Sequence, residues 1–184
     1  RHFLAAIAPR LLAAIARTPD PDATLLNLGG VSDSLGGKGM LWELLRFHPP
    51  SLDLTVQICS SSPFLARLLA SNPGMIDELL DSLLVPRLPS PPALRADLAE
   101  LCHGAADIGS IVSAFKASQQ LRVGVNDLLD RQTATTTSAS LSAIAEAILC
   151  VVMAREEVRL VERLGEPQAG PGASCGVRAG PIVL

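Results

Sequence analysis

The chain has 184 residues, a net charge of −3, and 48% hydrophobic but only 3% aromatic residues. Its length fits one domain, or a small domain with an appendage. The net negative charge and the scattered basic residues do not favour nucleic-acid binding. No apolar run reaches 18 residues without a charge, which disfavours a membrane-spanning helix. Since aromatic residues are few, the core residues are Leu, Ala, Val and Ile. Ala and Leu favour helices, whereas chains rich in strands rely on β-branched and aromatic residues, so we predict an all-α fold.

The four cysteines are far apart in the sequence and form no CxxC or Cys/His ligand spacing. Free cysteines in apolar surroundings pack as small hydrophobic side chains. We therefore expect a reduced, cytoplasmic compartment for Cys59, Cys102, Cys150 and Cys175.

The first third of the chain predicts short helices separated by Pro and Gly. One helix is expected from His2 to Arg17, ending before Pro19, and its inward residues are Leu4, Ile7, Leu11, Leu12 and Ile15. Asp22 would cap a second helix that Gly29 and Gly30 end. A third helix is expected from Lys38 to Phe47, before His48-Pro49-Pro50.

The middle of the chain repeats a cap followed by a proline in the first helical turn. Ser51 is predicted to cap residues 52–59, Ser62-Pro63 to start residues 64–70, and Asn72-Pro73 to start residues 74–84. Prolines between 86 and 92 form a linker, and another helix follows at 93–103. We divide the chain into a helical linker-like region (1–90), a helical lead-in (91–165) and a tail (166–184) rich in Gly, Pro and Ala, disordered or truncated.

A long helical hairpin is predicted from Phe115 to Gly165. Its first helix carries one stripe at helical spacing, made of Phe115, Ser118, Arg122, Val125 and Leu129. Its second helix is expected to bury Leu141, Ile144, Ala145, Ile148, Leu149 and Val152. The stripe places the charged side chain of Arg122 on an apolar face.

The motifs that could carry chemistry are incomplete. Residues 29–33 (GGVSD) resemble a nucleotidyltransferase loop, but the second carboxylate needed to hold two metal ions is replaced by Leu35. We interpret the stretch as a plain loop between helices. Asp77 and Asp81 share a helix face, where a solvated surface is favoured over a metal site, and the histidines are isolated.

No catalytic, cofactor or metal residue is therefore assigned. The candidate structural or partner contacts lie on the first helix of the hairpin. Two roles are open for the Arg122 side chain. It could form a salt bridge or a hydrogen bond to the backbone within the protein, or it could bind a partner or a nucleotide phosphate. The candidates are Phe115, Lys116, Gln119, Arg122 and Asp127.

Several stretches together resemble one family. They are Phe115-Lys116 followed by Gln119, Leu121-Arg122 and Asp127, then Leu141 and Ala145-Glu146-Ala147 with the ending RLGEP, and upstream LLNLGGVSDSLGGKGMLWELLRFHPPSL and CSSSPFLARLLASNPGMIDELLDSLL. In this order and spacing they resemble the bacterial glutamate–ammonia-ligase adenylyltransferase, also called glutamine synthetase adenylyltransferase/adenylyl-removing enzyme. The resemblance covers residues 1–167.

The resemblance implies two nucleotidyltransferase units, each followed by a helical bundle, in the intact enzyme. One unit adds AMP from ATP to a tyrosine of glutamine synthetase, and the other removes it by phosphorolysis. Magnesium and ATP are the implied cofactors, and glutamine synthetase and a PII-type signalling protein are the implied partners. This segment is similar to the helices that lead into a catalytic unit.

The sequence departs from the family after RLGEP, where a Gly-rich loop with a Ser-Asp-x-Asp pair is expected and CGVRAGPIVL stands instead. We therefore expect a fragment without transfer activity of its own. The alternative is a non-enzymatic helical module that binds a protein partner.

Overall fold

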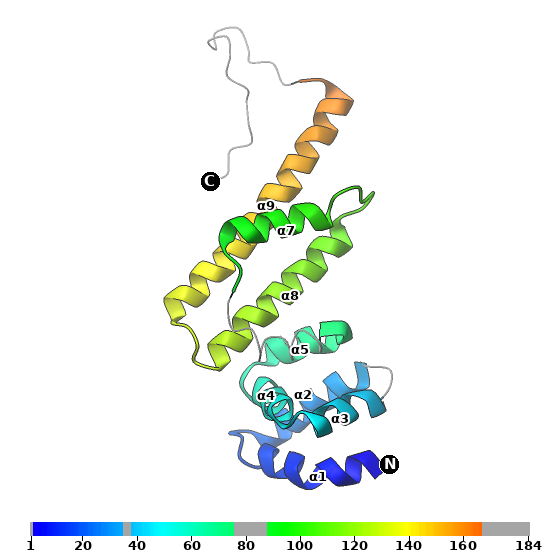
Figure 1. Cartoon of the computed structure of the whole chain (residues 1–184), viewed down its shortest axis with the longest axis vertical. Coiled ribbons are helices and arrows are strands. Elements are labelled where there is room, and N and C mark those ends of the chain that lie inside the picture. Colours follow the sequence, from blue (N-terminus) through cyan, green and yellow to red (C-terminus); the bar gives the residue numbers. More distant parts are fainter. Residues whose placement is uncertain (1, 35–37, 76–87, 167–184) are drawn as a thin grey trace.

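The computed structural model describes residues 2–34, 38–75 and 88–166. Every α-helix and 3₁₀ turn in these ranges is shown in chain order in Figure 1, and no strand occurs within them. The prediction of an all-α fold is confirmed. The elements are α1 (His2–Ile15), α2 (Pro21–Ser34), α3 (Lys38–Phe47), α4 (Pro49–Ser61), α5 (Pro63–Ser71), η1 (Pro73–Met75), α7 (Pro91–Leu101), α8 (Gly109–Leu128) and α9 (Ala134–Leu164).

Two hydrophobic cores lie along an elongated molecule, and α8 belongs to both. The first core joins α1 to α5 and receives Ala117, Leu121 and Val125 from α8. The second core lies among α7, α8 and α9 and receives Phe115 and Val123 from α8. Figure 1 shows α8 between the N-terminal helices on one side and α7 with α9 on the other.

The spacing of its buried residues explains how α8 serves two cores. At about 100° per residue, Ala117, Leu121 and Val125 form one stripe, whereas Phe115 and Val123 lie on roughly the opposite side. The sequence prediction of a single buried stripe was therefore incomplete. An apolar helix buried on two faces connects the two halves of the molecule.

Local capping sets several helix starts. The Ser62 side chain accepts a hydrogen bond from Leu65 N at 3.3 Å ahead of Pro63, as predicted. Thr133 caps α9 by accepting from Thr136 N at 3.3 Å. The carboxylate of Asp20 accepts from Ala23 N at 2.9 Å, so Asp20 is the capping residue of α2, and the prediction of Asp22 was wrong by two positions.

Several predicted boundaries differ from the structure; α1 ends at Ile15 and not at Arg17, and α8 begins at Gly109, ahead of Phe115. Gly29 and Gly30 do not end α2, which continues to Ser34, because Leu28, Val31 and Ser32 on the inner face are buried. Burial here outweighs the low helix propensity of Gly, and the predicted interhelical loop at 29–33 is helix instead. Ser51 is not a cap but a buried position inside α4, which starts at Pro49.

The hairpin between α8 and α9 is closed by side chains. Gln132 Nε2 donates to Val123 O at 3.0 Å, and Thr137 Oγ1 donates to Asp127 Oδ1 at 2.6 Å. Asp130 adopts φ +52°, a left-handed conformation that Asp tolerates better than most residues. These contacts fix the direction in which α9 leaves the turn.

The predicted buried face of α9 was partly wrong. Ile144 is buried, and Ile148 and Val152 pack on the second core as predicted. Leu141 and Leu149 are 41% and 50% exposed, and Ala145 is exposed too. The buried side is instead centred on Ile144 and Ala147, because α7 and α8 approach α9 from that direction.

Candidate functional site

Gln119 is a buried polar side chain on the side of α8 that faces the second core. It lies one turn from both Phe115 and Val123 and points toward α7 and α9. It is 91% buried, since 9% of its surface is exposed. Within the ranges that the structure describes, its amide forms no hydrogen bond, although buried amides are normally paired.

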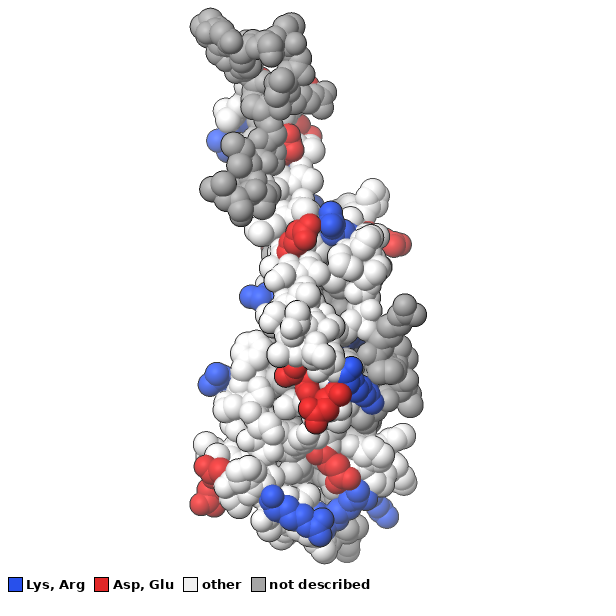
Figure 2. All heavy atoms as spheres, turned by 90° about the vertical axis from the view of Figure 1, so that its left-hand side faces the viewer, with Lys and Arg blue, Asp and Glu red and all other residues white. Residues whose placement is uncertain are grey.

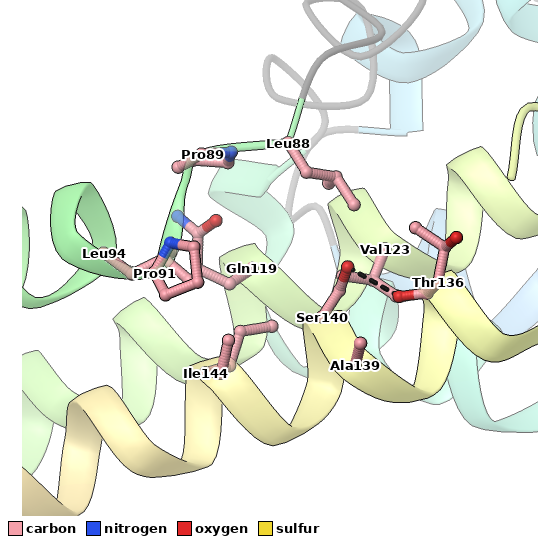
Figure 3. A pocket seen from close by; sticks show the side chains of 11 residues that line it. Leu88, Pro89, Pro91, Leu94, Gln119, Val123, Thr136, Ala139, Ser140 and Ile144 are labelled. Atoms are coloured by element: carbon pink, nitrogen blue, oxygen red, sulfur yellow. Dashed lines mark hydrogen bonds between the residues drawn. The ribbon is translucent and has the colours of Figure 1, made fainter.

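A pocket of about 230 Å³ surrounds this amide (Figure 3). One wall comes from the segment before α7 and from its first turns, and the other comes from α9. Two hydroxyl side chains line the α9 wall: Ser140 Oγ donates to the backbone carbonyl of Thr136 at 2.9 Å, and Thr136 Oγ1 lies 3.0 Å from Thr133 Oγ1. The pocket is lined by Leu88, Pro89, Pro91, Leu94, Gln119, Val123, Thr136, Ala139, Ser140, Ala143 and Ile144, none of them charged.

The structure does not bring the five predicted contact residues to one point. Phe115 is buried in the second core, and Gln119 lies in the pocket one turn further along. Lys116 is exposed, and Asp127 is exposed at the end of α8, where it holds Thr137. The five residues therefore stay candidate contacts at separate places on α8, and Gln119 is the one that lines a cavity.

Arg122 is half-buried on α8. Its backbone carbonyl accepts Asn126 Nδ2 at 2.9 Å, and its guanidinium has no hydrogen-bond or ion-pair partner among the described residues. The predicted choice between a structural bond and a partner contact stays open for this side chain.

A second pocket, of about 340 Å³, lies between the two halves of the molecule. The junction of α4 and α5 contributes Ser62, Phe64 and Leu65, and α9 contributes Thr137 and Leu141. Its floor on α8 includes Gly124, where α5 comes very close: an added Cβ would lie 2.6 Å from Leu65 Cδ1. Sequence reasoning missed this contact, because nothing in the local sequence pairs Gly124 with α5.

Charged side chains near the second core join helices to each other. Arg95 Nη2 of α7 lies 3.1 Å from Glu146 Oε1 of α9. Arg155 Nη2 donates to the carbonyl oxygens of Ala105 and Ala106, which holds α9 against the turn before α8. On the face drawn in Figure 2, basic side chains adjoin one another at the lower end and acidic side chains gather above them, while charges are scattered elsewhere.

The other residues considered from the sequence lie apart from these pockets. His48 and His103 are exposed, and Asp77 and Asp81 lie outside the described residues. Cys59 and Cys102 are buried, as expected for small hydrophobic side chains, and burial raises the pKa of the Cys59 thiol to about 12. No group of three or more His, Cys, Asp or Glu side chains in the described ranges could hold a metal ion.

The second half of α9 carries exposed apolar side chains beyond the reach of α7 and α8 (Figure 1). Val158, Leu160 and Leu164 are 57%, 51% and 72% exposed. By length and composition alone, α9 could cross a membrane, with a mean hydropathy of 1.8 over its most apolar window. Glu146 and Arg155 contact α7 and the turn before α8, and Ile144 and Ala147 are buried in the second core, while 11% of that apolar window is buried in the structure.

Comparison with known proteins identifies related sequences. The family model of glutamate-ammonia ligase adenylyltransferase matches residues 52–176, more than half of the chain. A bifunctional glutamine synthetase adenylyltransferase/adenylyl-removing enzyme of Pseudomonas aeruginosa is 29% identical over 95% of this chain. The enzyme of the same name from Chromobacterium violaceum is 29% identical over 83%. The chain spans 18% of the length of each relative, and no solved structure matches.

Proposed function

Since the chain belongs to the glutamate–ammonia ligase adenylyltransferase family, we propose that it is a helical scaffold segment of an enzyme that transfers AMP to and from glutamine synthetase. The match over residues 52–176 carries this proposal, because it runs from α4 through both cores to the end of α9. Glutamine synthetase is then the protein acted on, with a PII-type signalling protein as regulator, in the cytoplasm.

In this proposal the described helices supply shape and no reacting group. The charged residues that could be mistaken for a site hold helices together: Glu146 pairs with Arg95, and Asp127 accepts from Thr137. The sequence has Leu35 where the GGVSD stretch would need a second metal-binding carboxylate, and α2 runs through that stretch as helix. Two-metal nucleotidyl transfer needs such a pair. ATP and Mg²⁺ would therefore be bound by another unit of the enzyme.

The test is AMP incorporation by the isolated chain. Purified chain, Mg²⁺, ATP labelled in its α-phosphate and glutamine synthetase are mixed, and label on glutamine synthetase is counted. We expect no incorporation above a sample without the chain. A relative of full length serves as the positive control. Incorporation by the chain would overturn the scaffold role, because the described helices would then contain a catalytic site.

A second function, a helical module that binds a protein partner, is favoured by the exposed apolar side chains at the end of α9. Scattered exposed apolar residues are ordinary, but these lie on one projecting helix. Titration of the isolated chain with glutamine synthetase and with a PII-type protein separates the two functions. Saturable binding without AMP transfer supports the module, and absence of binding to either protein leaves the scaffold role.

A further inference from the structure

We propose that the pocket around Gln119 binds an uncharged peptide segment, with one bulky apolar side chain in the pocket and its backbone amide paired with the Gln119 amide. The inference rests on the pocket's own chemistry and is independent of the enzymatic role. Three features of the pocket carry it: its size, its uncharged lining and its unpaired amide.

The size of the pocket fits one or two side chains. Its volume of about 230 Å³ is below the roughly 300–1,000 Å³ that encloses a drug-sized ligand. The walls formed by Leu94, Val123 and Ile144 belong to the second core and are held by burial. A leucine-sized group would therefore meet apolar surface on both sides, from α7 and from α9.

The lining selects against charge. No Asp, Glu, Lys or Arg is among the described residues that line it, so a charged group placed against them would lose water without gaining a partner. Pro89 and Pro91 offer no backbone N–H, which leaves few donors on that wall. The ligand portion that enters must be neutral.

The Gln119 amide supplies the polar contact. A primary amide presents a carbonyl acceptor and an N–H donor side by side, and a peptide group presents the complementary pair. Figure 3 shows this amide extending from α8 toward the segment with Pro89 and Pro91, inside the pocket. The residue is 91% buried, its amide has no hydrogen bond in the described ranges, and its polar atoms are therefore available to a ligand in the pocket.

Capped amino acids test the proposal on the full chain. The probe is N-acetyl-leucine methylamide, and its glycine and aspartate analogues are the controls. Binding is followed by NMR through the side-chain NH₂ signal of Gln119 and the methyl signals of Leu94, Val123 and Ile144. For about thirteen non-hydrogen atoms at the efficiency of a drug-sized ligand, we expect a Kd on the order of 1 mM. The glycine and aspartate probes are expected to bind at least about tenfold more weakly, for want of an apolar side chain and because of charge.

Two variants separate binding from structure. Gln119→Met keeps the volume and removes the amide, so binding should weaken about threefold to tenfold while Tm changes by less than about 2 °C. A residue with a purely structural role would lower Tm when replaced. Ala139→Leu adds bulk at the pocket and should abolish binding, whereas Ala145→Leu makes the same change on an exposed part of α9 outside the pocket and should not.

The proposal is overturned by any of four results. The first is a leucine probe that does not saturate the chain at about 20 mM. The second is a glycine probe that binds as well as the leucine probe. The third is a Gln119→Met variant with a lower Tm and an unchanged Kd. The fourth is a free protein in which the pocket methyl groups already show NOEs to side chains of residues 76–87, since the chain would then fill its own pocket.

Discussion

Gly124 of α8 lies directly against Leu65 of α5, and its replacement tests the contact between the two halves of the molecule. A Cβ built on Gly124 would lie 2.6 Å from Leu65 Cδ1, 2.7 Å from Cδ2 and 3.2 Å from Cγ. Carbon atoms in contact prefer about 3.5–4.0 Å. Leu65 is only 5% exposed and belongs to the first core, so its side chain has little room to move away.

Two opposing terms decide the effect of Gly124→Ala. Ala favours a helix interior over Gly by about 0.5–1 kcal/mol. Overpacking a core by a methyl group costs about 1–3 kcal/mol. The difference predicts a net loss of roughly 0–2.5 kcal/mol in the free energy of unfolding, and a larger loss for Gly124→Val.

Gly29→Ala is the matched control. Gly29 also lies inside a helix, but an added Cβ would meet no atom within 4 Å. This variant should therefore gain about 0.5–1 kcal/mol, the propensity term alone. The gap between the two variants isolates the cost of contact with Leu65.

Urea denaturation followed by circular dichroism measures each variant. In a Leu65→Ala background, which itself costs about 2–5 kcal/mol, the clash is absent and Gly124→Ala should become stabilising. The reasoning is refuted if Gly124→Ala stabilises the original chain as much as Gly29→Ala does, because α5 and α8 would then be further apart than described.

Two further predictions concern single side chains. Burial raises the pKa of the Cys59 thiol from 9.0 to about 12, so the unfolded chain releases this proton at lower pH than the folded chain does. The free energy of unfolding should therefore fall by up to about 1.4 kcal/mol per pH unit between about pH 9 and pH 12. Denaturation at several pH values measures this slope, and Cys59→Ala should remove it. Ser62→Ala removes the cap of α5 and should cost about 1 kcal/mol in urea denaturation, whereas Ser61→Ala, at the exposed end of α4, should change stability by less than about 0.5 kcal/mol.

Local signals in the sequence predicted most of the fold. Helix starts with a cap and a proline, such as Ser62-Pro63, and stops such as His48-Pro49 lie where expected, because their causes are confined to a few neighbouring residues. Gly29-Gly30 misled the prediction, since a local signal for a helix end was outweighed by burial of Leu28 and Val31 against other helices.

The candidate site depended on contacts between distant residues. The sequence singled out Gln119, but only the fold places Leu88, Pro89 and Ile144 around it. The second buried face of α8 was missed for a similar reason, because the sequence does not show that helices pack on two opposite sides of α8. The same limit explains why Leu141 and Leu149 were predicted to be buried and are exposed.

The scaffold role is tested most directly by a chimera. In the Pseudomonas aeruginosa relative, the segment matched by this chain is replaced by residues 1–184, and AMP incorporation into glutamine synthetase is measured beside the isolated chain and a chimera that also carries Gly124→Val. We predict transfer by the chimera, reduced transfer by its Gly124→Val form, and none by the isolated chain. A chimera that folds but transfers no AMP, or an isolated chain that transfers it, would contradict the scaffold role.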